Sequence, residues 1–266
     1  MEISSIIGYF LAVLVGISLG LIGSGGSILS VPILVYIMHV EPVLATGYSL
    51  FIVGVSALVG GIQKAKQQLV DFKNVALFGI PTIIAVFLTR NFIVPAIPEK
   101  LIEIGTFVVT KSVFVMLVFA VVMVIASIRM IKPMQHKESE SDKPLNMRAI
   151  VFQGLGIGLI AGFVGAGGGF LIIPALYFLA KISMKKAIGT SLFIIAFQSL
   201  IGFIGDLNRT PAMDWNLLLG FTLASIVGIF IGNLLSKYIS GDKLKTSFGW
   251  FVLLMGIYII LKEVVL

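Results

Sequence analysis

The stretches GLIGSGGSILSVPIL (20–34) and GFVGAGGGFLIIPAL (162–176) decide the fold of this chain. Each places a run of small residues inside a hydrophobic segment. A shift of 142 residues aligns 20–62 with 162–204 without a gap, and 16 of the 43 positions are identical. Further along, Val70-Asp71-Phe72 matches Met213-Asp214-Trp215. The chain is therefore two tandem copies of one unit.

The composition around these stretches requires lipid as the solvent. Of the 266 residues, 58% are hydrophobic and 12% are charged, and a water-soluble domain of this size could not cover such a chain with polar surface. A helix that crosses the hydrocarbon layer needs about 20 apolar residues. We expect an all-α integral membrane protein, multi-pass in the cell inner membrane, with hydrophobic segments at 6–38, 43–63, 74–94, 104–131, 149–180, 187–205, 216–236 and 246–265.

The polar stretch 133–147 divides the two copies. It predicts a first membrane repeat at 1–132, a cytoplasmic linker at 133–147 and a second membrane repeat at 148–266. The net charge of +7 would suggest nucleic acid in a soluble protein. Here Lys and Arg occupy short connections between apolar segments, where they act as topology signals. We therefore expect the lipid bilayer, and no nucleic acid, as a partner.

Loop charge discriminates between two topologies. If each copy has four spans and the N-terminus is inside, ten Lys and Arg lie inside and nine outside, so no bias results. If each glycine run turns its segment into a hairpin, either spanning twice or re-entrant, the copies are inverted. With the N-terminus outside, fourteen basic residues then lie inside, and only Arg90, Lys100, Lys111, Arg209 and Lys262 lie outside. The second arrangement obeys the positive-inside rule, so the sequence favours an inverted repeat.

The glycine runs have two interpretations. Small residues let helix backbones approach closely in membranes. A helix broken near the midplane can instead bind an anion at the N-terminus of its second half, and repetition of the break in both halves is typical of transporter binding sites. Ser27 suits the N-cap of a helix that begins near Ile28. The substrate-binding candidates at the breaks are Gly23, Ser24, Gly25, Gly26, Ser27, Gly165, Gly167, Gly168 and Gly169.

Hydroxyl and carboxyl groups supply the remaining candidates. Hydroxyls could donate to anion oxygens or form interhelical hydrogen bonds, and the candidates are Thr46, Ser49, Thr190 and Ser191. Asp206 ends an apolar segment and is the candidate for proton coupling, with a solvated helix end as the alternative. Asp71 and Asp214 precede helices, where they suit N-caps.

The residues quoted above resemble the sulfite exporter TauE/SafE family of membrane permeases. The matching elements are GSGGSILSVP and GAGGGFLIIP, the following ATGYSL and AIGTSL, and the pairs Asp71-Phe72 and Asp214-Trp215. The resemblance implies transport of small anions such as sulfite or organosulfonates. The first copy differs in carrying Ser24 and Ser27 where the second has Ala166 and Gly169, so we expect two unequal half-sites.

Enzyme chemistry is not expected. The two histidines, His39 and His136, fall in polar connections and cannot serve Ser24 or Ser27 as a base. The chain has no cysteine, no histidine cluster at metal-ligand spacing and no Walker sequence, so neither a metal nor another cofactor is expected. The function expected is a secondary transporter of a small anion by alternating access. An anion channel and a non-transporting scaffold or assembly subunit stay open as alternative functions. The chain could also form a homo-oligomer.

Overall fold

The computed structural model describes residues 3–23, 26–104, 107–131, 147–165, 167–180, 182–207, 213–236 and 241–265. Ser24, Gly25 and nearly all of the predicted linker lie outside these residues. The first half contains α1 (Ile3–Ile22), α2 (Ser27–Tyr36), α3 (Pro42–Lys66), α4 (Phe72–Leu88), η1 (Thr89–Ile93), α5 (Val94–Ala96), β1 (Lys100–Ile104), β2 (Phe107–Thr110) and α6 (Lys111–Ile131). The second contains α7 (Met147–Val164), α8 (Gly169–Leu179), α9 (Met184–Leu207), α10 (Trp215–Leu235) and α11 (Gly241–Val265).

Both glycine runs interrupt a helix, as the sequence predicts. The first predicted segment divides into α1 and α2, and the fifth into α7 and α8. Gly23 and Gly165 have φ angles of +78° and +71°, a backbone region that residues with a Cβ rarely adopt. Ser27 is the first residue of α2 and its N-cap is Gly26. The expectation that Ser27 caps this helix is therefore wrong.

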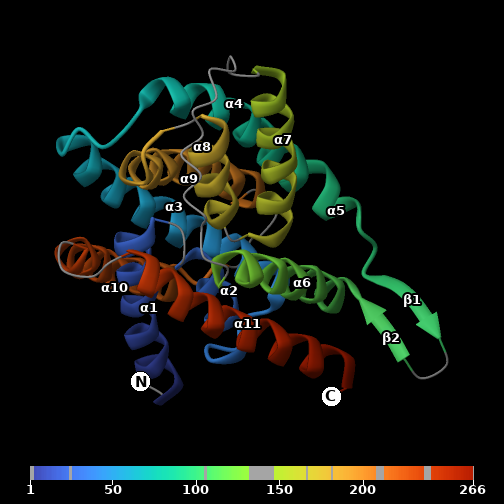
Figure 1. Cartoon of the computed structure of the whole chain (residues 1–266). Helices are drawn as coiled ribbons and strands as arrows, with labels where there is room; N and C mark the ends of the chain where they lie inside the picture. Colours follow the sequence, from blue (N-terminus) through green and yellow to red (C-terminus); the bar gives the residue numbers. More distant parts are fainter. Residues whose placement is uncertain are drawn as a thin grey trace.

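The connection before α6 differs from the sequence prediction. The expected hydrophobic segment 104–131 is helical only from Lys111 onwards. The preceding residues form an antiparallel hairpin, in which Lys100 pairs with Thr110 and Ile104 with Phe107. In Figure 1 this hairpin projects from the helical body. The β-branched and aromatic residues of Phe107-Val108-Val109-Thr110 favour a strand, but the hydropathy of this stretch suits a membrane helix as well, so hydropathy alone did not separate the two.

In the main helix pairs, a helix of one half packs on a helix of the other half. α1 packs on α10 and α7 packs on α4, while α3 packs on α9 and α6 on α11 (Figure 1). Two hydrogen bonds between the halves accompany this packing. The Tyr48 hydroxyl accepts the Asp214 N–H at 2.6 Å, and the Thr190 hydroxyl accepts the Asp71 N–H at 3.0 Å. Tyr48 and Thr190 occupy aligned positions of the two copies, as do the two aspartates.

These aspartates begin helices, as the sequence predicts. The Asp71 carboxylate accepts the N–H of Asn74 at the start of α4, and the Asp214 carboxylate accepts the N–H of Leu217 at the start of α10. Each side chain thereby satisfies a backbone donor that has no partner inside the helix. The aspartates therefore fix where α4 and α10 begin.

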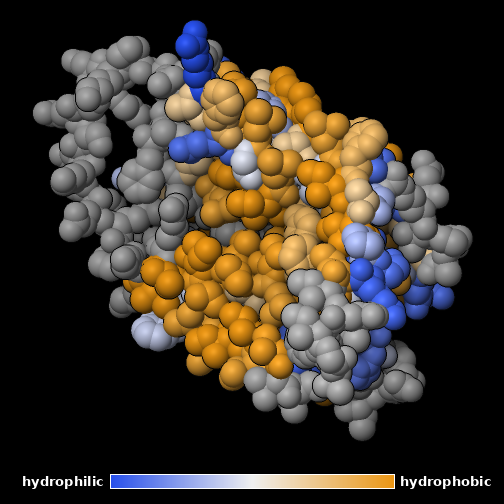
Figure 2. All heavy atoms as spheres, turned by 90° about the vertical axis from the view of Figure 1, so that its right-hand side faces the viewer, coloured by the Kyte–Doolittle hydropathy of each residue, from blue (hydrophilic) through white to orange (hydrophobic). Residues whose placement is uncertain are grey.

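The outer surface is strongly hydrophobic. Figure 2 shows one face on which hydrophobic side chains make up most of the described surface. Every long helix exposes large apolar side chains, for example Phe10 on α1, Phe152 on α7 and Leu254 on α11. Within the described residues, six helices are long and apolar enough to cross a membrane. The chain is therefore a helical membrane protein whose exterior faces lipid.

Glycines bring α1 and α10 into backbone contact. A Cβ on Gly16 would lie 1.8 Å from the Ser225 carbonyl oxygen, and one on Gly228 would lie 2.0 Å from the Val13 carbonyl oxygen. Small residues drive such close crossings in membranes, because lipid provides no hydrophobic force between helices. Small residues thus serve close packing at this crossing, which lies outside the two breaks.

We predict that Gly16→Leu disrupts the crossing of α1 and α10. The side chain has no space, and overpacking costs about 1–3 kcal/mol or more. Size-exclusion chromatography and thermal unfolding in detergent should show less monodisperse protein and a lower Tm. Gly156→Leu is the matched control, because a Cβ at Gly156 meets nothing within 4 Å. Equal Tm values for the two variants would contradict the prediction.

Candidate functional site

A buried arginine marks the site. Arg90 lies in η1, the π-helical turn that continues α4, and is only 1% exposed. A cation among membrane-spanning helices is costly, and such residues face the bundle interior and mark substrate or ion pathways. π-helical turns also occur frequently at functional sites. Arg90 is therefore the first residue to examine for function.

Two other helices supply partners for the Arg90 guanidinium. Nη1 lies 3.1 Å from Oδ2 of Asp206, near the end of α9, and 3.0 Å from Oγ1 of Thr46, near the start of α3. The Thr46 hydroxyl donates its own proton to the Val43 carbonyl at 2.7 Å. It can therefore act only as an acceptor toward Arg90. We call Arg90, Asp206, Thr46 and Gly165 the Arg90 site.

Of the two partners in the ion pair, Asp206 is the more exposed. The Asp206 side chain is 17% exposed, whereas that of Arg90 is 1% exposed. Gly47 faces the carboxylate, since a Cβ there would lie 3.0 Å from Asp206 Oδ2. An anion that approaches the guanidinium therefore meets the carboxylate first, and the two compete for the same donors.

The second glycine break lies directly against this pair. A Cβ on Gly165 would lie 2.5 Å from Thr46 Cβ and 2.7 Å from Arg90 Nη2. Gly168 is the N-cap of α8, with a φ angle of +59° and no side-chain hydrogen bond to cap the helix. The N-terminus of α8 carries the positive end of the helix dipole. The break thus adds a second source of positive potential near Arg90.

Two polar side chains of α9 line the same break. Gln198 and Ser199 are fully buried. Gln198 Nε2 donates to the Gly167 carbonyl, and a Cβ on Gly167 would lie 3.1 Å from Ser199 Oγ. Within the described part of the chain, Ser199 Oγ and Gln198 Oε1 have no hydrogen-bond partner. Buried polar atoms nearly always have one, so these two atoms suit a bound ligand or water.

The first break has different surroundings. A Cβ on Gly23 would lie 2.6 Å from Ile188 Cγ2, and one on Gly26 would lie 2.0 Å from the Val15 carbonyl oxygen. α2, like α8, has a glycine N-cap and no capping side chain. Gly23 and Gly26 therefore meet apolar side chains and backbone where Gly165 meets Arg90. The two breaks therefore have unequal surroundings, while the predicted difference at Ser24 and Ala166 lies outside the described residues.

The other predicted hydroxyls take part in hydrogen bonds between or within helices. Ser49 is bonded to Ser30 of α2 at 2.5 Å. Thr190 accepts the Asp71 N–H, and Ser191 donates to the Ile188 carbonyl at 2.8 Å. Of the predicted hydroxyls, Thr46 is the one that contacts Arg90. Gly169 begins α8 beside Gly168.

Sequence reasoning missed Arg90. It assigned this residue to the outer positive charges, yet the side chain is buried in the bundle. The available signal was a single arginine within the hydrophobic segment 74–94, at the depth where intramembrane charge indicates function. Lys111, another of those charges, is also nearly buried and lies 3.8 Å from the exposed carboxylate of Glu99.

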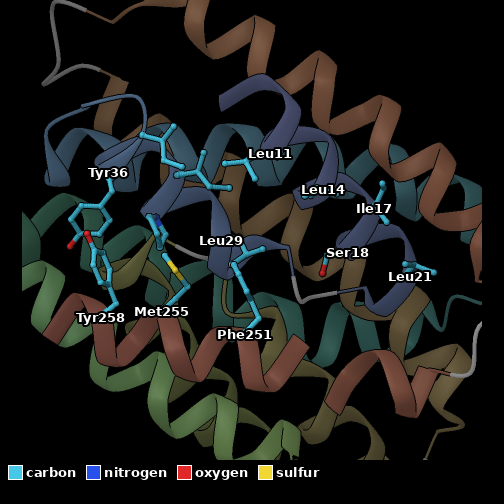
Figure 3. A pocket seen from close by; sticks show the side chains of 13 residues that line it. Leu11, Leu14, Ile17, Ser18, Leu21, Leu29, Tyr36, Phe251, Met255 and Tyr258 are labelled. Carbon is cyan, nitrogen blue, oxygen red and sulfur yellow. The ribbon is translucent and has the colours of Figure 1, made fainter. Parts of the chain in front are cut away.

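A large pocket lies elsewhere, between α1, α2 and α11 (Figure 3). Its volume is about 540 Å³, and Leu11, Leu29, Phe251 and Met255 are among the side chains that line it. Ser18 contributes a hydroxyl. An anion enclosed by such apolar side chains would lose hydration without gaining donors, which costs several kcal/mol. This pocket therefore suits an apolar group, and the anion candidates stay at the breaks.

Comparison with known proteins shows the family of the chain. The profile of the sulfite exporter TauE/SafE family matches residues 9–259. A "Probable membrane transporter protein" of Xylella fastidiosa is 30% identical over 258 residues, covering 94% of this chain and 92% of its own. Similar proteins are a probable membrane transporter of Methanocaldococcus jannaschii, 27% identical with 94% and 95% covered, and YunE of Bacillus subtilis, 28% identical with 91% and 89% covered. No solved structure matches.

The fold and the matches define a polytopic helical membrane protein of a transporter family. The chain belongs to the sulfite exporter TauE/SafE family. The relatives carry the general name of membrane transporter.

We predict that Asp206→Asn lowers the thermal stability of the protein. The substitution leaves the Arg90 cation buried without its carboxylate. Breaking a buried pair costs about 3–5 kcal/mol, and we expect about 1–3 kcal/mol here because the Asp206 side chain is partly exposed. Thermal unfolding in detergent measures the change.

A double-mutant cycle tests the origin of this effect. Arg90→Met combined with Asp206→Asn should recover much of the stability that Asp206→Asn alone loses, because no unpaired charge then stays buried. Glu99→Gln is the control, since the side chain of Glu99 is 87% exposed in its contact with Lys111. If the changes in stability caused by Arg90→Met and by Asp206→Asn simply add in the double variant, the ion pair does not contribute as proposed.

Proposed function

We propose that this protein is a secondary transporter that moves a small oxyanion, such as sulfite or an organosulfonate, by alternating access. The observation that carries the proposal is the burial of Arg90 against a glycine break of one half and polar groups of α3 and α9. Guanidinium binds oxyanions through parallel N–H donors. Membership of a transporter family agrees with this chemistry.

In this proposal the substrate takes the place of the Asp206 carboxylate on Arg90. Both are oxyanions, and both accept from the same N–H donors. Ser199 and the N-terminus of α8 supply further donors at the break. Protonation of Asp206 releases the guanidinium for the substrate, so Asp206 is the proposed coupling residue. Its partial exposure gives protons access.

The packing of the two halves supports the alternating-access part of the proposal. The helices α1, α3, α4 and α6 of the first half correspond to α7, α9, α10 and α11 of the second. If each helix is replaced by its counterpart, the α1–α10 pair becomes the α7–α4 pair, and the α3–α9 and α6–α11 pairs stay the same. The Tyr48–Asp214 and Thr190–Asp71 hydrogen bonds are exchanged in the same way. Such pseudo-twofold relations occur in transporters whose halves rock around a central site.

Two other functions predict different results. A channel would give flux that does not saturate with substrate and is not coupled to a gradient. A scaffold or assembly subunit would give no flux at all. The burial of a cation at a broken helix favours the transporter, because close packing alone does not require charge at that position.

Flux in proteoliposomes tests the proposal. We expect saturable movement of at least one member of a panel of sulfite, sulfate, small sulfonates and carboxylates. Arg90→Met should reduce that flux more than tenfold, since a charge-assisted hydrogen bond contributes about 1.5–3 kcal/mol. Arg148→Met is the matched control, because Arg148 is exposed at the start of α7. Normal flux from folded Arg90→Met protein would overturn the role of Arg90.

The inverted topology makes a separate prediction. With the N-terminus outside, the C-terminus also lies outside and the α8–α9 connection lies in the cytoplasm, whereas the parallel arrangement reverses both. A reporter fused to the C-terminus should therefore be active outside the cytoplasm. The natural chain has no cysteine, so Ser183→Cys provides one label between α8 and α9, where the two arrangements differ and the side chain is exposed. An impermeant thiol reagent added to intact cells should not modify it, and modification would argue for the parallel arrangement.

A further inference from the structure

The apolar pocket between α1, α2 and α11 opens on the lipid-facing surface. On α11 its lining residues extend from Phe251, near the middle of the helix, through Met255 to Tyr258 (Figure 3). The side chains of Leu14, Phe251 and Tyr258 line the pocket and are also exposed on the outer surface. A molecule of the surrounding bilayer can therefore enter the pocket from the side.

One end of the pocket carries charged and aromatic groups. Tyr36, the last residue of α2, meets Tyr258 edge to face, with ring centroids 5.9 Å apart. The Tyr36 hydroxyl donates to Glu263 Oε1 at 2.9 Å, and Lys262 Nζ lies 4.2 Å from the centre of the Tyr36 ring. Tyrosine and lysine side chains gather where the hydrocarbon layer meets water. We call Tyr36, Tyr258, Lys262 and Glu263 the rim, and the rim lies at the membrane surface.

The opposite end of the pocket lies deep in the membrane. Leu21, near the end of α1, and Leu29, near the start of α2, line it beside the first glycine break. On α11, the 11 residues from Phe251 to Lys262 correspond to about 16 Å at 1.5 Å per residue. This length is half of the hydrocarbon layer, which is about 30 Å thick. The pocket therefore extends through the depth of one lipid leaflet.

The helices around the pocket pack mainly on other partners. α1 packs on α10 and α11 packs on α6, so α1 and α11 leave about 540 Å³ between them and α2. Side chains that face a void lose dispersion contacts. Water does not suit the inner end, because a bound water needs two to four polar partners. Among the described residues that line this end, Ser18 contributes the one polar side chain. A flexible apolar chain therefore suits the pocket.

We propose that the pocket binds one zwitterionic phospholipid of the bilayer, with an acyl chain between α1, α2 and α11 and the headgroup at the rim. The charges of the rim are complementary to such a headgroup. Lys262 Nζ donates to the phosphate, and the Glu263 carboxylate accepts from the primary ammonium of an ethanolamine headgroup. An acyl chain that starts at the rim and follows α11 inward ends beside Leu21 and Leu29. This inference does not depend on the transport of an anion at the Arg90 site.

A lipid in this pocket differs from the lipids that coat the exterior. Three helices enclose its chain, and its headgroup meets a fixed cation and a fixed anion, so it exchanges with bulk lipid more slowly than the others. It also fills the space between the α1–α10 pair and the α6–α11 pair. The bound lipid therefore stabilises the packing of these two pairs.

Native mass spectrometry of the purified full chain tests this inference. The probe is palmitoyl-oleoyl phosphatidylethanolamine, added to delipidated protein in detergent, and we expect one lipid per chain to stay bound after the detergent is removed. Met255→Trp fills the pocket and should lower the bound fraction about tenfold or more. Leu254→Trp is the matched control, because Leu254 is exposed on α11 and does not line the pocket. It should leave the bound fraction within about twofold of the wild type.

Two further variants separate lipid binding from folding. Ser18→Phe fills the inner end of the pocket from α1 and replaces Met255→Trp if that variant does not fold. Lys262→Gln changes the rim alone and should lower the bound fraction about two- to fivefold, as expected for a partly solvated ion pair. Lys66→Gln, at an exposed lysine of α3, should not change it. Added lipid should raise the Tm of the wild type and of Leu254→Trp, and should leave that of Met255→Trp unchanged.

Three outcomes would overturn the inference. The first is a wild type that retains no phospholipid, or retains as much as Met255→Trp does. The second is retention of phosphatidylglycerol as strong as that of phosphatidylethanolamine, since an anionic headgroup has no ammonium for Glu263. The third is a preference for a free fatty acid or a detergent chain over the phospholipid, because the rim then contributes nothing to binding.

Discussion

A helix that breaks inside a membrane leaves backbone groups that lipid cannot hydrogen-bond, so protein must surround the break. In this chain α3 and α9 meet that requirement. The break at Gly165 lies against Thr46 of α3, and the break at Gly23 lies against Ile188 of α9. Of the candidate spans, α9 and α3 are the most buried, with 72% and 67% of an apolar 18-residue stretch inside the protein. The remaining helices are arranged around this central pair.

The central position of α3 and α9 also determines where charge can be held. Arg90 is tolerated because α3 contributes the Thr46 hydroxyl and α9 contributes Asp206. At the opposite end of the pair, Lys64 is buried beside Gly189. Arg90 lies directly against a glycine break, where a Cβ on Gly165 would clash with Thr46 and with Arg90 itself. This arrangement suits an anion that exchanges with fixed groups more than a static structural ion pair.

Close packing and ligand binding account for different glycines. Gly16 and Gly228 let α1 and α10 touch through their backbones, and neither has a positive φ angle. Gly165 and Gly168 have positive φ angles, and Gly165 contacts the Arg90 site. The packing interpretation thus applies to the α1–α10 crossing, and the binding interpretation of the second break is the proposal made above. The apolar pocket beside α11 belongs to neither group.

The sequence by itself determined the helical membrane class, the family, the places where two helices break and the N-caps at Asp71 and Asp214. These properties depend on local composition and spacing, since hydropathy, glycine conformation and capping act over a few residues. Only the tertiary structure decided the site. Arg90, Thr46 and Asp206 lie on three different helices, and their side chains meet through the packing of α3 on α9. No local pattern encodes that contact. For the same reason the hydroxyls of Ser49, Thr190 and Ser191 could not be told from that of Thr46 before their partners were known.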